Sequence, residues 1–410
     1  MRKQMVFGAI ALASAVVLAG CSGGGGSAGT SEEPADGSGA ELVIWTDEER
    51  EQAITDAAAA FEEETGATVT LVQKNFEDIR NDFINQVPTG EGPDITVGAH
   101  DWLGALVAAG VVDTVDLGDK ASEIEPVALE AMTYDGQLYA LPYSLETVAL
   151  IQNVDLVGDT APTTWDEMIQ MGTASGAERP FVINTGGQTG DAYTMYGFQT
   201  SFGAPVFVQD ASGSYTTEVG MGGPAGEAFA TWLGAQGANG SNVVSTTVDY
   251  DINNELFNTG KAPFTIQGPW AISAFPDVAN MKVSPIPTAG GEPAAPFVGV
   301  QGFYLSSQSK NALLAQEFLV NYLATEEAQQ ALYDADPRIP AWSTIAEDVS
   351  SDPIIAGFLA SSQNGVPMPS VPEMGSVWDL WNAAQVQIIN GADPVATWNQ
   401  MITDLQAAIG

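Results

Sequence analysis

The sequence predicts an α/β protein folded into two lobes or domains. The chain has 410 residues, more than a typical single domain. Apolar residues make up 45% of it, which is enough to build hydrophobic cores and argues against global disorder. Short apolar runs typical of buried strands alternate with segments of helical periodicity. This alternation indicates a mostly parallel sheet covered by helices.

The first twenty residues have the pattern of a secretory signal peptide. Arg2 and Lys3 precede an apolar run, residues 5–18, that is too short to span a bilayer. The run ends in Leu18-Ala19-Gly20-Cys21, which resembles a bacterial lipobox, and Cys21 is the only cysteine of the chain. The resemblance implies cleavage before Cys21 and lipid attached to its sulfur. We therefore expect an exported protein held at the outer face of the cytoplasmic membrane.

Ordered structure is expected after a flexible Gly- and Ser-rich linker at residues 21–40. Strand and helix patterns then alternate: a strand at 41–45, a helix at 48–64 ending before Gly66, a strand at 69–72, a helix at 76–87 and a strand at 94–97. In parallel sheets, ligands bind beyond the carboxyl ends of the strands. The segments 45–48 and 98–102 lie at two such ends.

The rest of the chain continues this alternation. Residues 134–137, Tyr-Asp-Gly-Gln, predict a hairpin because Asp-Gly favours a turn with positive φ. Residues 164–167, Thr-Trp-Asp-Glu, match a helix capping box. Further strands are predicted at 148–151, 262–266 and 298–305, and further helices at 311–323, 325–333, 354–361, 376–390 and 394–409.

The chain is strongly acidic, with 52 Asp and Glu against 11 Lys and Arg and a net charge of −41. Nucleic acid is excluded as a partner, because the chain offers no basic footprint that could displace its counterions. Anionic ligands are disfavoured for the same reason. An acidic surface is also repelled by anionic membranes, so the lipid would have to supply the anchoring. Neutral and cationic ligands remain open.

Common catalytic sites are hard to assemble from these residues. His100 is the only histidine, which excludes a multi-histidine metal site, and nothing indicates a cofactor. Cys21 would carry lipid and could not serve as a nucleophile. A carboxylate pair such as Asp101 and Glu146 keeps a glycoside hydrolase open as an alternative.

Sugar binding suits the same residues better. Neutral sugars need carboxylates or amides as partners for their hydroxyls, and flat aromatic rings against their C–H faces. Asp101 and Glu146, near strand ends, could bind the sugar hydroxyls. The later tryptophans Trp270, Trp378 and Trp381 could supply the aromatic rings.

A series of collinear segments carries a family resemblance. They are Leu42 to Trp45, Phe61 to Gly66, Gly90 to Ile95, Ala99 to Asp101, Tyr134 to Gly136 with Pro142 and Glu146, Phe257 to Lys261, Gly268 to Trp270, Pro296 to Val300 and Glu317 to Leu323. From Leu42 to about Asn390 the chain thereby resembles the maltose/maltodextrin-binding proteins of bacterial ABC importers, which are extracellular solute-binding proteins of family 1.

The resemblance implies a two-lobed periplasmic-binding-protein-like fold of type II, with hinge strands and a ligand cleft between the lobes. One lobe would combine residues 41–145 with 301–348, and the other 146–300 with 349–410. Such a protein is not an enzyme: it captures a sugar and delivers it to the permease of an ABC transporter with its ATPase. We expect a monomer, held on the cell surface by the lipid on Cys21.

The resemblance also implies a ligand-binding set and no metal site. Some members match family motifs directly, whereas others stand in loops that have diverged. The predicted set is Asp47, Glu48, Asp101, Trp102, Glu146, Asp191, Tyr193, Trp270, Trp378 and Trp381. His100, Trp45 and Trp165 are interpreted instead as packing residues.

Several departures from the family bear on the ligand. Glu48 stands where the family has a lysine, Gly98 where it has a tryptophan, and Trp102 where it has an arginine. Losing Lys and Arg donors while keeping acids and tryptophans suggests an oligosaccharide, with maltose or a longer α-glucan the leading choice. Another disaccharide such as trehalose is the first alternative. A cationic ligand, such as a polyamine or basic peptide, is the second.

Overall fold

The computed structural model describes residues 37–210 and 215–410. The predicted signal peptide, Cys21 and most of the predicted linker lie outside these residues. The chain divides into two units, residues 1–34 and residues 35–410, and the fold below is that of the second unit. No helix among the described residues is long and apolar enough to cross a membrane.

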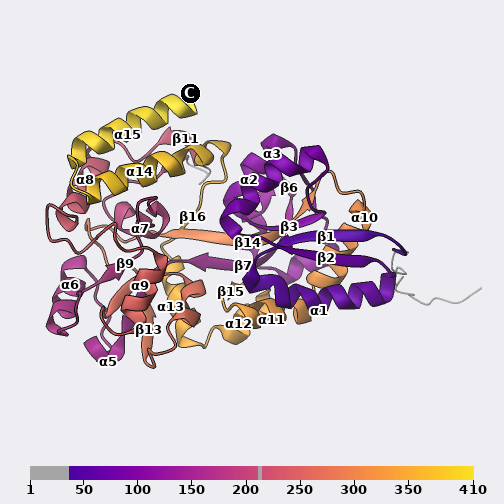
Figure 1. Ribbon diagram of the computed structural model, residues 1–410, viewed down its shortest axis with the longest axis horizontal. Helices are drawn as coiled ribbons and strands as arrows, with labels where there is room; N and C mark the ends of the chain where they lie inside the picture. Colours follow the sequence, from indigo (N-terminus) through magenta and orange to yellow (C-terminus); the bar gives the residue numbers. More distant parts are fainter. Residues whose placement is uncertain (1–36, 211–214) are drawn as a thin grey trace, which may run out of the picture. The chain divides into compact units, whose positions relative to one another are not determined.

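The first group of elements surrounds an eight-stranded sheet (Figure 1). Six of its strands follow the order β15-β7-β14-β3-β1-β2, and β4 and β16 both pair with β14. The strands are β1 (Glu41–Thr46), β2 (Thr68–Gln73), β3 (Ile95–Ala99), β4 (Val112–Asp113), β7 (Ala140–Thr147), β14 (Phe297–Ser306), β15 (Ile339–Pro340) and β16 (Val366–Pro367). The helices are α1 (Glu48–Thr65), α2 (Phe76–Gln86), α3 (Leu103–Ala109), α4 (Pro126–Ala131), α10 (Ala312–Glu317), α11 (Glu326–Ala335) and α12 (Ser343–Val349).

The second group surrounds a four-stranded sheet in the order β13-β8-β12-β9. Its strands are β8 (Ala149–Asn153), β9 (Val182–Ile183), β12 (Phe264–Gln267) and β13 (Met281–Ser284). Its helices are α5 (Val154–Val157), α6 (Trp165–Ala174), α7 (Ala192–Thr200), α8 (Gly223–Gln236), α9 (Tyr250–Asn258), α13 (Pro353–Ser362), α14 (Val377–Ile389) and α15 (Pro394–Ile409). Two short hairpins complete the fold: β5 (Thr133–Tyr134) with β6 (Gln137–Leu138), and β10 (Phe207–Gln209) with β11 (Tyr215–Val219).

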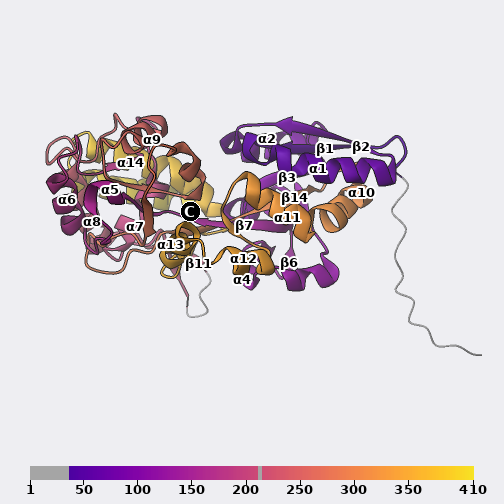
Figure 2. The same ribbon diagram turned by 90° about the horizontal axis from the view of Figure 1, so that it is seen from below.

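The prediction of a mostly parallel sheet is wrong. Among the described strands, β1 pairs in parallel with β2 and β3, β12 with β9, and β14 with β16. The other pairs are antiparallel, among them β14 with β3, β4 and β7, and β8 with β12 and β13. The cause is the path of the chain. It leaves the first sheet along β7 directly into β8, and it returns from the second sheet along β14, so the two crossing strands run in opposite directions (Figures 1 and 2).

Most predicted elements are confirmed with shifts of a few residues at their ends, but the predicted helix 311–323 is interrupted. It consists of α10 followed by a π-helical segment, Phe318–Leu323. The wider turn leaves backbone carbonyls without helical partners. The Lys120 ammonium donates to two of them, the carbonyl oxygens of Val320 at 2.7 Å and Ala324 at 2.9 Å.

The structure confirms two local predictions, the hairpin at residues 134–137 and the helix cap at residues 164–167. The hairpin forms at Asp135 and Gly136, with φ values of 50° and 75°. Thr164 caps α6 by accepting a hydrogen bond from the Glu167 backbone amide at 3.2 Å. The Glu167 carboxylate reaches back one residue further than a capping box requires, to the Thr163 amide.

Two hydrophobic clusters fill the fold. One contains the strands of the first sheet and Trp45, and the other contains Trp165, Phe198, Trp381 and Trp398. Trp45 and Trp165 are buried, as predicted for packing residues. The Trp398 indole donates to the Met221 carbonyl oxygen at 2.8 Å and thereby joins α15 to the start of α8.

A glycine substitution tests this packing. A Cβ on Gly226 would lie 1.9 Å from the Met221 carbonyl oxygen and 2.5 Å from Trp398 Nε1. We expect Gly226→Ala to lower the free energy of unfolding by about 1–3 kcal/mol, although alanine is the better helix former. Chemical denaturation measures this change. Gly375→Ala, where a Cβ meets nothing within 4 Å, is the control, and an equal loss in both variants would contradict the packing argument.

Candidate functional site

The carboxyl ends of β1 and β3 carry the first acidic residues of the site. Asp47 follows β1 and caps α1 by accepting from the Arg50 backbone amide at 3.2 Å, and it also forms an ion pair with the Arg50 guanidinium. Arg50 is buried and lies over the rings of Phe76 and Tyr143, at 5.4 and 5.3 Å from the ring centroids. Glu48 is exposed, so in this structure the first loop contributes Asp47 and Arg50 to the interior and leaves Glu48 in solvent.

Asp101 lies at the end of β3, in the short helical turn His100–Trp102. Its side chain is only 8% exposed, and its Oδ1 has no hydrogen-bond partner among the described residues. Burial raises the pKa of the Asp101 carboxyl to about 7, while the charge of Arg80 acts in the opposite direction. A buried acceptor without a donor is costly unless another molecule supplies the donor.

Trp102 occupies the space that a side chain at position 98 would need. A Cβ on Gly98 would lie 2.7 Å from Trp102 Cε3, so the indole ring rests directly on the glycine backbone. The opposite neighbour is Phe76, whose ring centroid lies 4.9 Å from that of Trp102. Glycine at 98 and tryptophan at 102 are therefore sterically linked, and the aromatic ring of this loop is anchored at 102.

Glu146 lies near the end of β7 and is held by two donors. Gln301 on β14 donates from Nε2 to Glu146 Oε1 at 2.8 Å, and the buried Arg338 forms an ion pair with Glu146 Oε2. Arg338 also pairs with Asp336, and its guanidinium lies 5.9 Å from the ring centroid of Trp270. The expected loss of basic donors is thus incomplete, since Arg50 and Arg338 both lie in this region.

An aromatic array extends from Trp270. The Trp270 ring packs flat over Gly268, where a Cβ would lie 2.1 Å from ring carbon Cζ3. Tyr193 lies 6.3 Å from Trp270 and 5.9 Å from Phe297, between ring centroids. Trp378 is 6.2 Å from Phe297. Tyr193, Trp270 and Trp378 are each partly exposed, as rings that receive a ligand must be.

Two predicted site residues have supporting positions instead. Trp381 has no exposed surface, stacks behind Trp378 at 5.6 Å and donates its indole hydrogen to Gln199 Oε1 at 2.9 Å. Asp191 caps α7 through the Thr194 amide at 3.0 Å and accepts a hydrogen bond from Asn184 at 2.6 Å. Asp191 thus fixes the first turn of the helix that presents Tyr193.

Buried polar atoms without partners gather around Glu146. Five such atoms lie on β7, on β14, in the turn after β3 or in the first turn of α7, and within the described residues each lacks a hydrogen bond. They are Asp101 Oδ1, Tyr143 OH, Ser144 Oγ, Tyr193 OH and Gln301 Oε1. Burial raises the pKa of Tyr143 to about 12 and that of Tyr193 well above its usual value, and the charge of Glu146 raises both further. The charge of Glu146 acts on Asp101 and on both tyrosines, Gln301 contacts Glu146 directly, and Ser144 lies two residues before it on β7, so these groups surround one carboxylate.

His100 is a structural residue, as predicted. Its Nδ1 accepts from the Val300 backbone amide at 3.0 Å, so the ring proton is assigned to Nε2, which lies 3.0 Å from the Met368 carbonyl oxygen. Burial lowers the pKa of His100 to about 4. Both ring nitrogens are committed to backbone, so His100 is not available as a general base.

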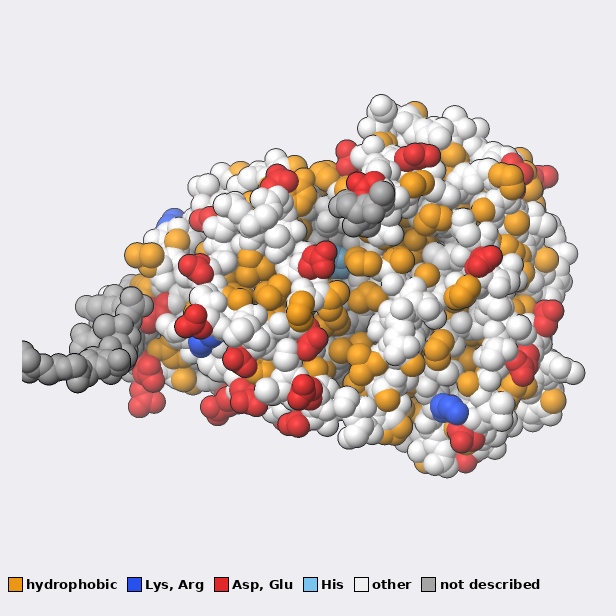
Figure 3. Space-filling model, turned by 180° about the vertical axis from the view of Figure 1, so that it is seen from behind, with side chains coloured by type: hydrophobic (Ala, Val, Ile, Leu, Met, Phe, Trp, Pro, Cys, Tyr) orange, Lys and Arg blue, Asp and Glu red, His pale blue; other side chains and the backbone are white. Residues whose placement is uncertain are grey.

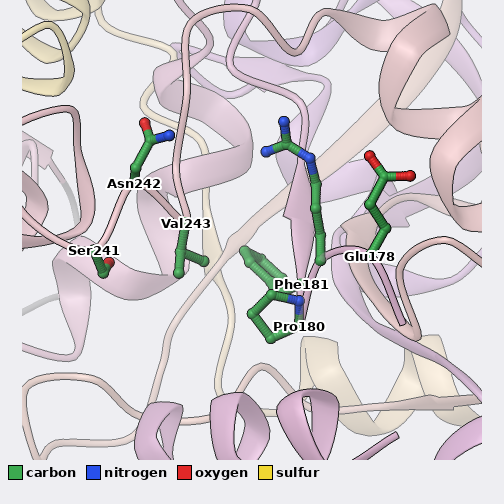
Figure 4. Close-up of a pocket in the computed structure, with 7 residues that line it drawn as sticks. Glu178, Pro180, Phe181, Ser241, Asn242 and Val243 are labelled. Atoms are coloured by element: carbon green, nitrogen blue, oxygen red, sulfur yellow. The ribbon is translucent and has the colours of Figure 1, made fainter. Parts of the chain in front are cut away.

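We also considered metal sites, cavities and surface charge in the rest of the described structure. Among the described residues, no group of three or more His, Cys, Asp or Glu could hold a metal ion. A cavity of about 310 Å³ lies near β9, lined by residues 178–181 and 241–243, and contains none of the predicted site residues (Figure 4). Figure 3 shows acidic side chains spread over one face, with few basic ones among them.

The predicted set names acids and aromatic rings of this region, but it does not include Arg50, Arg338, Tyr143 and Gln301, which the structure places beside them. Gln301 had a usable signal, because it shares a sheet face with Ser144, its register partner, and with Glu146 two residues along. Arg338 had none, since it is separated from Glu146 by 192 residues and follows no strand pattern that points to the site.

Comparisons with known proteins identify the family of the chain. A family model described as bacterial extracellular solute-binding protein matches residues 56–357. The galactooligosaccharide-binding protein of Bacillus subtilis is 28% identical over 88% of each chain. A maltooligosaccharide ABC transporter solute-binding lipoprotein of Streptococcus pneumoniae is 28% identical, over 92% of this chain and 90% of that protein.

A comparison with solved structures identifies a protein with a similar fold. The Thermus thermophilus maltotriose binding protein bound with maltotriose has a TM-score of 0.81 and 31% identity, and the match covers 90% of this chain and all of that one. The chain therefore belongs to the family of bacterial extracellular solute-binding proteins, as its motifs indicated, and has their two-lobed α/β fold.

Proposed function

We propose that this chain is the substrate-binding lipoprotein of an ABC sugar importer. It captures an oligosaccharide at the site around Glu146, with maltose or a longer α-glucan as the leading ligand, and delivers it to the membrane permease. The named relatives support the sugar class, since they bind galactooligosaccharide, maltooligosaccharide or maltotriose.

The observation that carries this proposal is the set of unpartnered buried polar atoms beside partly exposed aromatic rings. Gln301 Oε1 can only accept hydrogen bonds, and the Asp101 carboxyl accepts them when it is ionised and can also donate one when it is protonated. The hydroxyls of Tyr143, Ser144 and Tyr193 can accept or donate. Sugar hydroxyls do both, so one neutral polyol could satisfy the whole set. The C–H faces of its rings would pack on aromatic side chains such as Trp270.

The alternatives fit the charges less well. A cationic ligand would meet two buried guanidinium groups, Arg50 and Arg338. Burial lowers the pKa of Arg50, and the positive charge of Arg338 lowers it further. A glycoside hydrolase built on Asp101 and Glu146 would need one carboxyl to exchange a proton and the other to attack the sugar or to activate water. Asp101, with its raised pKa, could do the first, but both oxygens of Glu146 are already held, by Arg338 and Gln301.

The remaining parts of the proposal follow from the family and the N-terminal pattern. The lobes would comprise 41–145 with 301–348 and 146–300 with 349–410, with the ligand between them. Lipid on Cys21 would hold a monomeric receptor on the cell surface, and one relative is itself named a lipoprotein. The binding residues would be Asp101, Trp102, Glu146, Tyr193, Trp270 and Trp378, with Asp47, Asp191 and Trp381 in support.

The ligand can be identified by titrating the intrinsic tryptophan fluorescence of the 35–410 unit with neutral sugars. The panel would contain maltose, maltotriose, trehalose, raffinose and a galactooligosaccharide, with spermidine as the charged control. We expect a saturable change with at least one α-glucan and no dependence of its Kd on ionic strength, because the ligand is neutral. A response to spermidine alone, or release of shorter sugars, would overturn the proposal.

Removing the Trp270 ring should weaken that binding. We expect Trp270→Ala to cost about 1–3 kcal/mol of affinity through lost ring contact and lost apolar burial, measured by calorimetric titration with the sugar that the unmodified protein binds best. Tyr139→Ala, which removes an aromatic side chain beside the β5–β6 hairpin, is the control. An unchanged Kd for Trp270→Ala would remove this residue from the site.

Asp101→Asn should raise stability while it lowers affinity. The folded-state pKa of about 7 exceeds the usual value of 3.8, so the stability that a protonated Asp101 provides is lost as the pH rises toward 7. Asparagine stays neutral. The variant should therefore be more stable at pH 8 by up to about 4 kcal/mol, and by less than about 1 kcal/mol near pH 4.

Denaturant unfolding at both pH values measures the difference, and sugar titration measures the loss of affinity. Asp56→Asn, on the exposed side of α1, is the control and should change neither quantity. A stability gain of the same size at pH 4 and pH 8 would contradict the assigned protonation of Asp101.

A further inference from the structure

Arg338 contacts three segments that are distant in sequence. It lies between α11 and β15, is 6% exposed, and pairs with Asp336 two residues earlier. It also pairs with Glu146 on β7 and lies over the ring of Trp270, which follows β12 of the other sheet. Trp270 itself packs against both hydrophobic clusters.

The geometry of the guanidinium explains how it can serve all three. Its Nε faces Asp336 Oδ2 and its Nη1 faces Glu146 Oε2, so two edges of one planar group hold two carboxylates. The flat face of the guanidinium lies over the Trp270 ring. Since Gln301 holds the other oxygen of Glu146, the Glu146 carboxylate cannot rotate without breaking one of two buried contacts.

The positive charge of Arg338 changes the pKa values of three other groups of the site. Arg338 acts against the rise in the pKa of Tyr193 and of Tyr143, and it adds to the lowering of the pKa of Arg50. Its position is therefore central to the site and not peripheral. A buried charge pair is costly to break from one side, because the remaining charge is left without a partner.

We propose that Arg338 is a positioning residue for ligand binding. It sets the orientation of the Glu146 carboxylate and fixes the Trp270 ring, so that one acceptor group and one stacking surface reach the ligand in a fixed relation. This inference rests on the proposed function, because it concerns the same oligosaccharide site. It adds a residue that the family motifs in this sequence do not mark.

The test compares variants at 338 by fluorescence titration with the sugar that the unmodified protein binds best. Arg338→Met keeps an apolar stem but removes the charge, and we expect affinity to fall on the order of tenfold to a hundredfold. Arg338→Lys restores a charge that can reach Glu146 but not the fork that holds Asp336 as well, so it should recover part of the loss. Lys282→Met breaks the exposed Lys282–Asp159 pair and is the control.

A double-mutant cycle shows whether Arg338 acts through Glu146. In Arg338→Met/Glu146→Gln, we expect an affinity loss close to the larger single loss, because both changes remove the same arrangement. Additive losses would mean that Arg338 contacts the ligand independently and would overturn the positioning role. If Arg338→Met does not fold, the same cycle with Arg338→Lys gives the answer.

Two further outcomes separate this inference from the proposed function. A lower melting temperature with an unchanged Kd in Arg338→Met would make the residue merely structural and would overturn the inference alone. An unmodified protein that binds no sugar of the panel would overturn the proposed function, and the positioning role with it.

Discussion

The backbone hydrogen bonds between β7 and β14 hold together the two sheets and the proposed binding site. The two strands pair from Val298 with Thr147 to Tyr304 with Ala140, and they carry the chain out of the first sheet and back into it. Their side chains supply Tyr143, Glu146 and Gln301 to the site. The ring of His100 binds β14 directly, through the Val300 amide. A single antiparallel pair thus serves as both the connection between two sheets and the floor of the proposed binding site.

The buried polar groups of this site lower the stability of the folded chain. Asp101 is buried without a donor for its Oδ1, and two arginines lie close enough to disfavour one another. Such groups lower stability when the site holds no ligand, yet they give a polar ligand its hydrogen-bond partners. The two buried arginines are tolerated because each forms an ion pair with a carboxylate: Arg50 with Asp47, and Arg338 with Glu146 and Asp336.

Prediction from the sequence succeeded where the determinants are local. Caps, turns and strand ends identified α1, α6 and the hairpin at Asp135, and motif order identified the family. It failed on strand direction, because the return of the chain along β14 leaves no mark in the residues of β14 itself. It also missed Arg338, whose role depends on a contact across 192 residues. Trp381 was indistinguishable from a binding residue until its burial behind Trp378 was known.

The close fit of Trp102 over Gly98 also constrains how this loop can change during evolution. A side chain at 98 and the indole at 102 compete for one volume, so a chain cannot carry large groups at both positions. A descendant that restores an aromatic residue at 98 must first, or at the same time, lose the one at 102. Each substitution alone would leave either a clash or an empty place beside Phe76. The two positions are therefore expected to change as a pair, which makes the return of an aromatic residue to position 98 by a single substitution a rare event.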